Sequence, residues 1–273
     1  MFQETLGFIG GGNMARSLVG GLLARGLPAR QVIVSDPVTT QRELLTTQLG
    51  VRVTDDNAIV ARAAGVLLFA VKPQQLALVA KQLVPAITHR PLVISIAAGI
   101  RTADLQRWLG GLPVVRAMPN SPALKGCGVT GLYATEAVSQ AGKKLAETIL
   151  GAVGPALWIA QEEQMDVVTA VSGSGPAYFF LLIEMLESVG VELGLAPEVS
   201  RRLAMETAFG AGQMAHAATE PASTLRAQVT SKGGTTEAAL QLLEAAGVRA
   251  IFTDAIAAAA KRSAELAEEF GKS

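Results

Sequence analysis

Apolar and polar positions follow two different patterns along the chain, and the first pattern runs to about residue 160. Short apolar runs rich in β-branched residues recur there, each of a length suited to a buried strand: Leu6–Ile9, Val32–Ser35, Val66–Ala70, Leu92–Ile96 and Val114–Met118. Between them lie amphipathic segments such as Met14–Arg25, whose apolar residues recur three and four positions apart, as on one helix face. Buried strands that alternate with helices are typical of βαβ units, so this half predicts a parallel sheet.

The second pattern begins after about Gln164, where strand-like runs stop and long helical segments follow. These segments are Ala177–Leu193, Pro197–His216, Thr235–Ala246 and Val248–Phe270. Pro197 suits the first turn of its helix, and Gly194 ends the helix before it. The chain therefore predicts an α/β domain over residues 1–163, followed by an all-α domain over residues 164–273.

Composition and charge exclude several classes of function. Half of the residues are apolar, and the formal net charge is zero with no run of basic residues. These features give no electrostatic basis for binding nucleic acid or an anionic membrane. The two histidines, His89 and His216, lie far apart with no carboxylates spaced around them, so we expect no metal site.

The expected compartment is the cytoplasm. Cys127 is the single cysteine, so no internal disulfide is possible and a reducing environment is favoured. No basic segment followed by an apolar one marks a secretory signal at the start. The longest uncharged stretch, residues 167–183, is shorter than the roughly twenty apolar residues of a membrane helix and contains two glycines and a proline. We therefore expect no membrane partner.

A dinucleotide-binding fingerprint follows the first strand. Gly10-x-Gly12-x-x-Ala15 lies between a strand and a helix that begins near Asn13. Gly10 permits the tight turn, Gly12 lets the main chain approach a pyrophosphate, and Ala15 lets the helix pack against the strand. The free N–H groups of the helix start carry a partial positive charge that suits a diphosphate. The first domain is therefore predicted to be of the Rossmann type.

The residues after the second strand leave the choice of cofactor open. Asp36 stands where an acidic residue would accept hydrogen bonds from the adenosine ribose, which favours NAD. Ser35 and Arg42 would instead favour the 2′-phosphate of NADP. From these residues alone the two choices are equally favoured.

Six motifs together resemble one family, the pyrroline-5-carboxylate reductases, over essentially the whole chain. They are GFIGGGNMA (7–15), AVKPQ (70–74), SIAAGI (95–100), RAMPNSPA (116–123), SGSGPAYFF (172–180) and VTSKGGTTEAAL (229–240). The resemblance implies reduction of the cyclic imine 1-pyrroline-5-carboxylate to L-proline with NADPH, NADH also being accepted. It also implies a homodimer through interlocked helical domains, with larger rings such as a pentamer of dimers.

The resemblance also assigns the site residues. With Asp36 and Pro73 added, the expected cofactor contacts are Gly10, Gly11, Gly12, Asn13, Met14, Ser35, Asn57, Val71, Lys72, Ala97, Ala98 and Gly99. The expected substrate contacts are Thr230, Ser231, Gly233, Gly234, Thr235 and Thr236. The chain departs from the usual family pattern at Lys232 and Ser121, where proline and threonine are usual. Its shorter loop from Glu220 to Thr230 leaves Glu220 without a role.

The segment Thr230–Thr236 also predicts an anion site from its residues alone. Two glycines and consecutive backbone N–H groups precede a helical pattern, an arrangement that suits a substrate carboxylate. The family places Thr236 beside the ring nitrogen as the orienting and proton-sharing group, the predicted catalytic residue. A helix cap with a flexible loop is the alternative interpretation.

Phe179 distinguishes two kinds of reduction. The related β-hydroxyacid dehydrogenases carry an acid/base lysine four residues after the second glycine of a Gly-x-Gly turn, where this chain has Phe179. An alcohol oxygen needs such a group, whereas an imine nitrogen can be protonated before reduction. Phe179 therefore favours an imine substrate over the alternative of a related reductase for another cyclic imino acid or a β-hydroxyacid. A cofactor-binding sensor without catalysis is a further alternative, which the intact hydroxyl and glycine residues of 230–236 disfavour. Arg116 is predicted to fix its loop, with carboxylate binding as the alternative.

Overall fold

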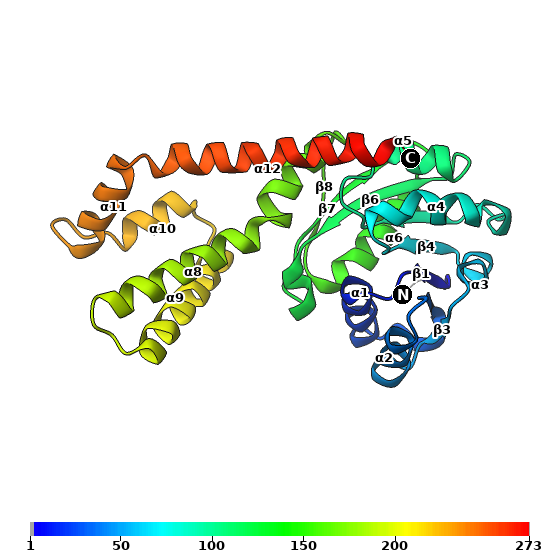
Figure 1. The fold of residues 1–273 in the computed structure, drawn as a ribbon, viewed down its shortest axis with the longest axis horizontal. Coiled ribbons are helices and arrows are strands. Elements are labelled where there is room, and N and C mark those ends of the chain that lie inside the picture. The colour runs from blue at the N-terminus through cyan, green and yellow to red at the C-terminus, as the bar shows by residue number, and fades with distance from the viewer. Residues whose placement is uncertain (1–2, 273) are drawn as a thin grey trace. The chain divides into compact units, whose positions relative to one another are not determined.

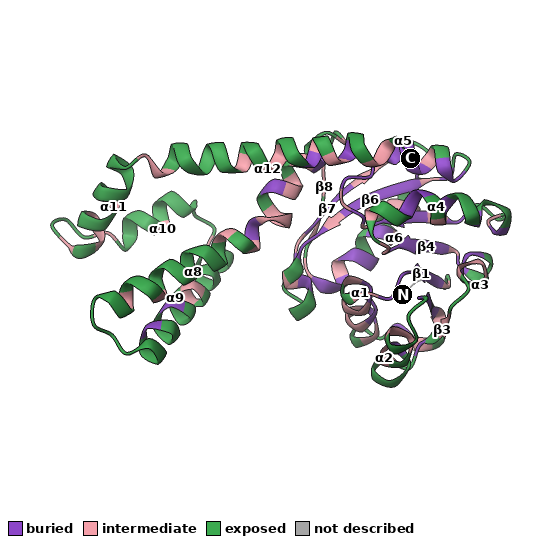
Figure 2. Cartoon of the chain, in the orientation of Figure 1, coloured by how far each residue is buried: buried purple, intermediate pink, exposed green. Residues whose placement is uncertain are grey.

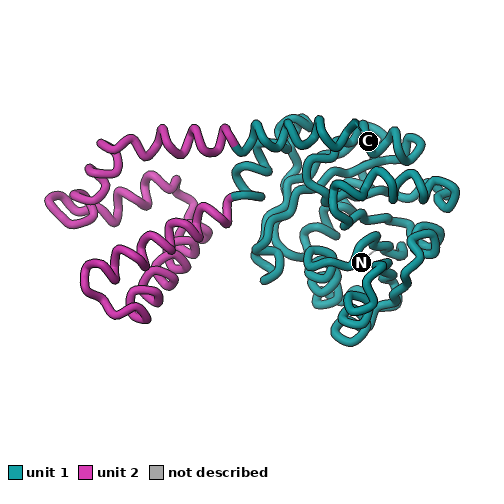
Figure 3. Tube along the Cα trace, in the orientation of Figure 1, with its two compact units in different colours: residues 1–174, 259–273 teal, residues 175–258 magenta. Residues whose placement is uncertain are grey.

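The computed structural model describes residues 3–272, which form two compact units (Figures 1 and 3). The first unit comprises the residues up to Ser174 together with those from Ala259 onward. The second comprises Gly175–Ala258. The last helix of the chain therefore contributes residues to both units, and its C-terminal end belongs to the first.

The first unit contains an eight-stranded sheet in the order β3-β2-β1-β4-β5-β6-β7-β8. The strands are β1 Leu6–Ile9, β2 Val32–Ser35, β3 Arg52–Thr54, β4 Val66–Phe69, β5 Leu92–Ser95, β6 Val114–Pro119, β7 Thr130–Ala134 and β8 Ala156–Trp158. Neighbours from β3 to β6 pair in parallel, with Phe8 of β1 opposite Val34 and Leu68. β7 is antiparallel to β6, and β8 is parallel to β7. The strand order reverses between β1 and β4.

Helices cover both faces of this sheet. They are α1 Asn13–Ala24, α2 Thr39–Leu49, α3 Asn57–Ala63, α4 Pro73–Leu83, α5 Thr102–Trp108 and α6 Gln140–Leu150. Successive residues of β1 enter different cores, because Phe8 packs with Leu18 of α1 on one face and Ile9 packs with Leu76 of α4 on the other. In a strand buried on both faces, apolar and polar residues do not alternate, because every side chain enters a core. This explains the continuous apolar runs in the sequence.

The second unit is all helical. It contains α8 Gly175–Glu192, α9 Pro197–Ala217, α10 Ala222–Gln228, α11 Thr235–Ala245 and the first part of α12 Val248–Gly271. α8 packs along α9, and the Ser200 hydroxyl donates a 2.7 Å hydrogen bond to the carbonyl oxygen of Glu187. Figure 2 shows most of these helices as exposed, and among this unit's described residues only Gly175, Ser200 and Ala204 are buried. Its apolar side chains lack a core of their own.

The Gly-x-Gly segment before α8 differs from the predicted turn. α7 Gln164–Val168 continues through a π-helical turn, Thr169–Gly173, almost to the first residue of α8. Gly173 lies close to the sheet there, since a Cβ would be 2.7 Å from the terminal methyl group of the Met118 side chain on β6. The glycine therefore serves close packing against the sheet rather than a reversal of the chain.

One helical run within the described residues, Gln164–Glu192, meets the length and composition criteria for a membrane span, with a mean hydropathy of 1.4. Core helices of soluble proteins meet the same criteria. Only 11% of the most apolar window is buried within the chain. This run therefore has an apolar face that a further surface must cover.

The predicted α/β half and the all-helical half are both confirmed, as are the five predicted strands to within one residue at each end. The sequence did not predict β3, β7 and β8, which are short or partly exposed, and the sheet is not wholly parallel. The predicted functional boundary between residues 163 and 164 stays a prediction, since the compact units divide at Ser174 and Ala259.

Candidate functional site

The loop between β1 and α1 requires glycine at its first position. Gly10 has a φ of +98°, and a Cβ there would lie 2.8 Å from the carbonyl oxygen of Ala70 at the end of β4. The Gly10 N–H donates a 2.8 Å hydrogen bond to the carbonyl oxygen of Ser35. The turn is thus held between the ends of β2 and β4, where no side chain fits.

Gly12, unlike Gly10, has open space where a side chain would be. It precedes the first residue of α1 with extended backbone, and no side chain of the described residues caps it. A Cβ on Gly12 would meet no atom within 4 Å, so this side of the loop is open. The first N–H groups of a helix have no partner inside it and carry a partial positive charge. An open, uncapped helix start fits the diphosphate of a dinucleotide.

Asp36 holds the same loop from the end of β2. Its Oδ2 accepts a 2.8 Å hydrogen bond from the Gly11 N–H, and its Oδ1 accepts one of 2.8 Å from the Val38 N–H. Arg42 donates to the carbonyl oxygens of Asp36, at 2.7 Å, and Pro37, at 3.0 Å. A carboxylate with only one N–H on each oxygen retains lone pairs for a ribose hydroxyl. Asp36 and Arg42 are therefore adjacent, and both cofactor interpretations remain open at this point.

Ser35 lies beneath the loop rather than at its open side. It is fully buried, and its hydroxyl donates a 3.3 Å hydrogen bond to the carbonyl oxygen of Phe8. Its own carbonyl oxygen accepts from Gly10. The structure thus gives Ser35 a supporting position, and its predicted contact with a cofactor stays a prediction.

The remaining cofactor residues also follow the carboxyl ends of parallel strands. Val71 and Lys72 follow β4, and Pro73 occupies the first turn of α4. Ala97, Ala98 and Gly99 follow β5, and Asn57 begins α3 after β3. Parallel strands that end at one edge of a sheet bring these segments together beside the reversal between β1 and β4, the usual place for a ligand in such a sheet. We therefore locate the candidate cofactor site at this edge.

Arg116 lies inside the first unit. Its side chain is 3% exposed and forms a 3.0 Å ion pair with Glu162, which also accepts from the N–H and the hydroxyl of Thr102 at 2.7 Å and 2.6 Å. These contacts join β6, the start of α5 and the segment before α7. The guanidinium is thus engaged by its own chain, which favours the interpretation that Arg116 fixes its loop.

The second unit holds the predicted substrate segment. Gly233 has a φ of +72°, and the Gly234 N–H donates a 3.0 Å hydrogen bond to the carbonyl oxygen of Ser231. The Thr230 hydroxyl donates to the carbonyl oxygen of Arg226 at 2.6 Å. Gly234 precedes Thr235, the first residue of α11, and no side chain among the described residues caps it. This helix start resembles that of α1, with a tight turn followed by uncapped N–H groups.

The Glu237 side chain binds one of the backbone amides of this loop. Its Oε2 accepts a 2.7 Å hydrogen bond from the Gly233 N–H, so this carboxylate fixes the left-handed turn. The sequence had not led us to a role for Glu237, although an acidic residue in the first turn of a helix often reaches back to the turn before it. Thr235 and Thr236, after the turn, receive no cap from any side chain that the structure describes, and their predicted contact with the substrate stays a prediction.

A cavity of about 530 Å³ adjoins this segment within the second unit, lined by Thr230, Glu237 and Glu244 among other residues. The Arg249 guanidinium, which donates a 2.7 Å hydrogen bond, lowers the pKa of the Glu244 carboxyl below its usual value. Glu244 also pairs with Arg226 at 3.2 Å. The charge of Glu244 is therefore neutralised by two arginines, whereas Glu237 accepts from the Gly233 N–H.

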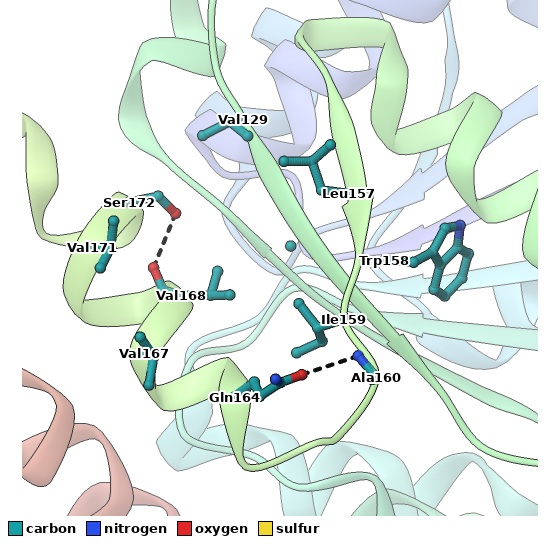
Figure 4. Close-up of a pocket in the computed structure, with 11 residues that line it drawn as sticks. Val129, Leu157, Trp158, Ile159, Ala160, Gln164, Val167, Val168, Val171 and Ser172 are labelled. Atoms are coloured by element: carbon teal, nitrogen blue, oxygen red, sulfur yellow. Dashed lines mark hydrogen bonds between the residues drawn. The ribbon is translucent and has the colours of Figure 1, made fainter. Parts of the chain in front are cut away.

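A second cavity, of about 620 Å³, lies in the first unit between β8 and α7 (Figure 4). Most of its lining is apolar, and the indole of Trp158 points away from the other labelled side chains. Its polar groups have partners, since Ser172 donates to the carbonyl oxygen of Val168 and Gln164 accepts from the Ala160 N–H. None of the predicted site residues lines it, so we assign it no part in the candidate site.

Two family models together match most of the chain. One described as pyrroline-5-carboxylate reductase dimerisation matches residues 162–266, and one described as NADP oxidoreductase, coenzyme F420-dependent, matches residues 5–99. A pyrroline-5-carboxylate reductase of Pseudomonas aeruginosa is 48% identical over 273 residues, covering 100% of both chains. One of Haemophilus influenzae is 41% identical, covering 97% of this chain and 98% of its own.

This chain belongs to the pyrroline-5-carboxylate reductase family. The solved reductase of Coxiella burnetii has a TM-score of 0.93 at 40% identity and covers 97% of this chain and 99% of its own. That of Plasmodium falciparum, with NADP bound, has a TM-score of 0.84 at 29% identity and covers 98% and 99%. The family is one of oxidoreductases that reduce 1-pyrroline-5-carboxylate to proline, so the predicted family, fold class and activity are confirmed.

Within the pyrroline-5-carboxylate reductase family, the individual site residues of this chain stay predictions. The structure brings the cofactor residues to one edge of the sheet and groups the substrate residues at the start of α11. It also shows contacts that the sequence did not reveal, above all the one between Glu162 and Thr102. Those residues lie 60 positions apart, and no local pattern links them.

Proposed function

We propose that this chain reduces 1-pyrroline-5-carboxylate to L-proline with NADPH, and that NADH is also accepted. Residues 1–163 act as the cofactor-binding domain, and residues 164–273 bind the substrate and form the dimer. The observation that carries the proposal is the pair of uncapped helix starts after tight glycine turns, at Gly12 and at Gly234. One suits a diphosphate and the other a carboxylate.

The residues at the sheet edge fit the cofactor. Bound NADPH supplies the hydride that reduces the imine carbon. The N–H groups of Asn13 and Met14 hold the diphosphate. Arg42 donates to the carbonyl oxygens of Asp36 and Pro37 and to the Thr39 hydroxyl, and its remaining N–H groups pair with a 2′-phosphate. Val71 to Pro73 and Ala97 to Gly99 border the remainder of the site from the ends of β4 and β5. The proximity of Arg42 and the family resemblance together favour NADPH.

The residues of the second unit fit an imino-acid carboxylate. The amides of Thr235 and Thr236, at the positive end of α11, hold the anion, and the Ser231 hydroxyl adds a donor. Glu237 keeps the preceding turn in place through the Gly233 N–H. The Thr236 hydroxyl orients the ring nitrogen and shares its proton. In this arrangement, a subunit's cofactor site works with the substrate segment of its partner.

The substrate itself explains why no acid/base lysine is needed. A protonated imine nitrogen carries a positive charge that reduction neutralises, so no strong base forms at the reacting centre. The chain therefore has to hold and orient the substrate rather than supply a proton at high cost. Phe179, which is 65% exposed in the single chain, fits this chemistry and not that of an alcohol.

Replacing Thr236 by alanine is expected to lower kcat by about 100-fold, because the ring nitrogen loses the hydroxyl that orients it for reduction. The KM for the imine should change little, because the backbone amides that hold its carboxylate remain. Steady-state kinetics with 1-pyrroline-5-carboxylate and each of NADPH and NADH measures both quantities. The wild type should show the higher kcat/KM with NADPH.

Thr236→Ser is the matched control, since it keeps the hydroxyl and should retain most of the activity. A proline-auxotrophic host should be rescued by the wild type and the serine variant but not by the alanine variant. Wild-type turnover in Thr236→Ala would remove this residue from the catalytic role. Turnover of a hydroxyacid but not of the imine would overturn the proposed function itself.

A second copy of the chain is the proposed cover for the apolar surface of the second unit. Large apolar side chains on α8 and α9 are exposed, among them Phe180 (65%), Leu186 (55%) and Phe209 (62%). Exposed apolar surface on this scale marks an interaction site. Glu184, Glu187 and Glu192 on α8 would be costly in lipid, whereas a protein interface allows their heads to reach its polar rim.

We accordingly expect a homodimer in the cytoplasm, from which a pentamer of dimers assembles, and no membrane or nucleic-acid partner. Sedimentation equilibrium should give a mass of at least twice the 28.2 kDa of the chain at micromolar concentration. A monomer under these conditions would contradict the dimer. A species that requires detergent to remain in solution would instead favour a lipid-covered face.

A further inference from the structure

The C-terminal end of α12 packs against the loop after β5. This loop, Ala97–Gly99, is one of the predicted cofactor segments. Phe270 packs against the buried cluster that contains Ala97 and Ile100. The last turn of the chain therefore lies directly behind the loop, within the first unit.

The contact is closest at Gly99. Its φ of +69° favours glycine, and a Cβ there would lie 3.2 Å from Cδ2 of Phe270 and 3.3 Å from Cβ of Leu266. Contacts this short leave no space between the loop and the helix. A displacement of Phe270 would thus change the support of the loop from behind.

Several polar contacts fix the end of α12. The Arg107 guanidinium donates a 2.6 Å hydrogen bond to the carbonyl oxygen of Gly271 and pairs with Asp104 at 2.9 Å. Gly271 also lies close to the Asp104 side chain, because a Cβ there would be 2.7 Å from its Oδ2. Further back, the buried Ser263 donates to Asp166 at 2.7 Å. The helix end is therefore held at two places along its length.

We propose that the last turn of α12 positions the cofactor loop, with Phe270 and Leu266 as positioning residues. This inference rests on the proposed function, because it assumes that Ala97–Gly99 border the cofactor. Phe270 touches the back of the loop and acts on the cofactor only through it. Small displacements of positioning groups have large effects on ligand geometry, since the ligand site is fixed to well below 1 Å.

The test is cofactor binding to Phe270→Ala without substrate, followed by the fluorescence of the NADPH nicotinamide. We expect the Kd for NADPH to rise by about tenfold. Phe270→Leu, which keeps an apolar side chain in contact with Gly99, should restore most of the affinity. If the alanine variant fails to fold, Gly99→Ala, which perturbs the same contact, is the test variant.

Gly99→Ala changes the other residue of the same contact and should also weaken NADPH binding. The double variant with Phe270→Ala should lose less NADPH affinity than the two single losses added together. The reason is that Phe270→Ala removes the ring atoms that the new Cβ would meet. Glu268→Ala, on the exposed side of the same turn, is the matched control and should leave the Kd unchanged.

Three outcomes distinguish a failure of this inference from a failure of the proposed function. If the wild type binds NADPH and reduces the imine while Phe270→Ala and Phe270→Leu bind NADPH normally, the positioning role is wrong and the proposed function stands. A lower unfolding temperature with an unchanged Kd would also overturn the positioning role, since it shows a purely structural one. If the wild type fails to bind NADPH, the proposed function fails and the inference fails with it.

Discussion

Gly10→Ala is expected to abolish measurable cofactor binding and to destabilise the first unit. A Cβ at this position would meet the carbonyl oxygen of Ala70 at 2.8 Å and its carbonyl carbon at 2.9 Å, both backbone atoms of the central sheet. The φ of +98° adds conformational strain that alanine does not tolerate. Together these effects should lower the free energy of unfolding by about 2–4 kcal/mol. If the loop moves to relieve them, the diphosphate site is lost instead.

Gly12→Ala provides the contrasting variant. Its Cβ would meet no protein atom within 4 Å, and the φ of −66° suits alanine, so the fold should keep its stability. The added methyl group would instead project into the space assigned to the diphosphate, and NADPH binding should fall. We expect Gly12→Ala to keep the stability of the fold but to lose affinity for NADPH. We expect Gly10→Ala to lose both.

Thermal unfolding and NADPH titration of the two variants measure these effects separately. Gly151→Ala is the neutral control, because a Cβ on Gly151 has open space around it and the residue lies far from the loop in sequence. If Gly12→Ala binds NADPH as tightly as the wild type, the open side of the loop does not face the diphosphate, and the assignment of the helix start is wrong.

Arg116→Met is expected to lower the free energy of unfolding by about 3 kcal/mol, because it leaves the largely buried Glu162 carboxylate without its cation. Arg116 is 3% exposed and Glu162 is 15% exposed, so water replaces little of the lost interaction. The Thr102 N–H and hydroxyl would remain as partners of Glu162, which limits the loss. Urea denaturation followed by circular dichroism measures the change.

Arg262→Met is the matched control on the surface of α12. Arg262 pairs with Glu265 at 3.0 Å and Glu269 at 2.8 Å, but its side chain is 54% exposed, and a pair of this kind contributes little. No measurable change in stability is expected. Glu162→Gln, which keeps an acceptor for Thr102, should be milder than Arg116→Met.

Urea denaturation together with steady-state kinetics of Arg116→Met decides between the two interpretations of Arg116. A stable Arg116→Met protein with a raised KM for the imine would show that the guanidinium binds the substrate carboxylate. An unstable protein whose folded fraction keeps the wild-type KM would show that it holds β6 and the start of α5 together. The contacts in the structure favour the second result.

The local order of residues was sufficient to predict the cofactor loop. Gly10, Gly12 and Ala15 lie within six consecutive positions, and strand, turn and helix each depend on neighbours in sequence. The same holds for the segment from Thr230 to Thr236 before α11. The role of Asp36 was only partly predictable: its place after β2 suggested a ribose contact, but its hydrogen bonds to the Gly11 and Val38 amides required the folded loop.

Contacts between distant segments could not be predicted in this way. The pairing of β7 with β6 depends on register across the sheet, and the short exposed strand β8 leaves no clear periodicity. The helical pattern of 248–270 correctly predicted α12 but not that its end returns to the first unit. A helix face shows that it needs a partner without showing which one.

The amino-acid sequence by itself determined the family, most of the strands and helices, and the residues available at the two glycine turns, because each depends on short-range residue patterns. Only the tertiary structure decided that Arg116 pairs with Glu162 and that Phe270 lies against Gly99. The physical reason is that close packing and hydrogen bonding act between surfaces, and the chain's path brings those surfaces together irrespective of their separation in sequence.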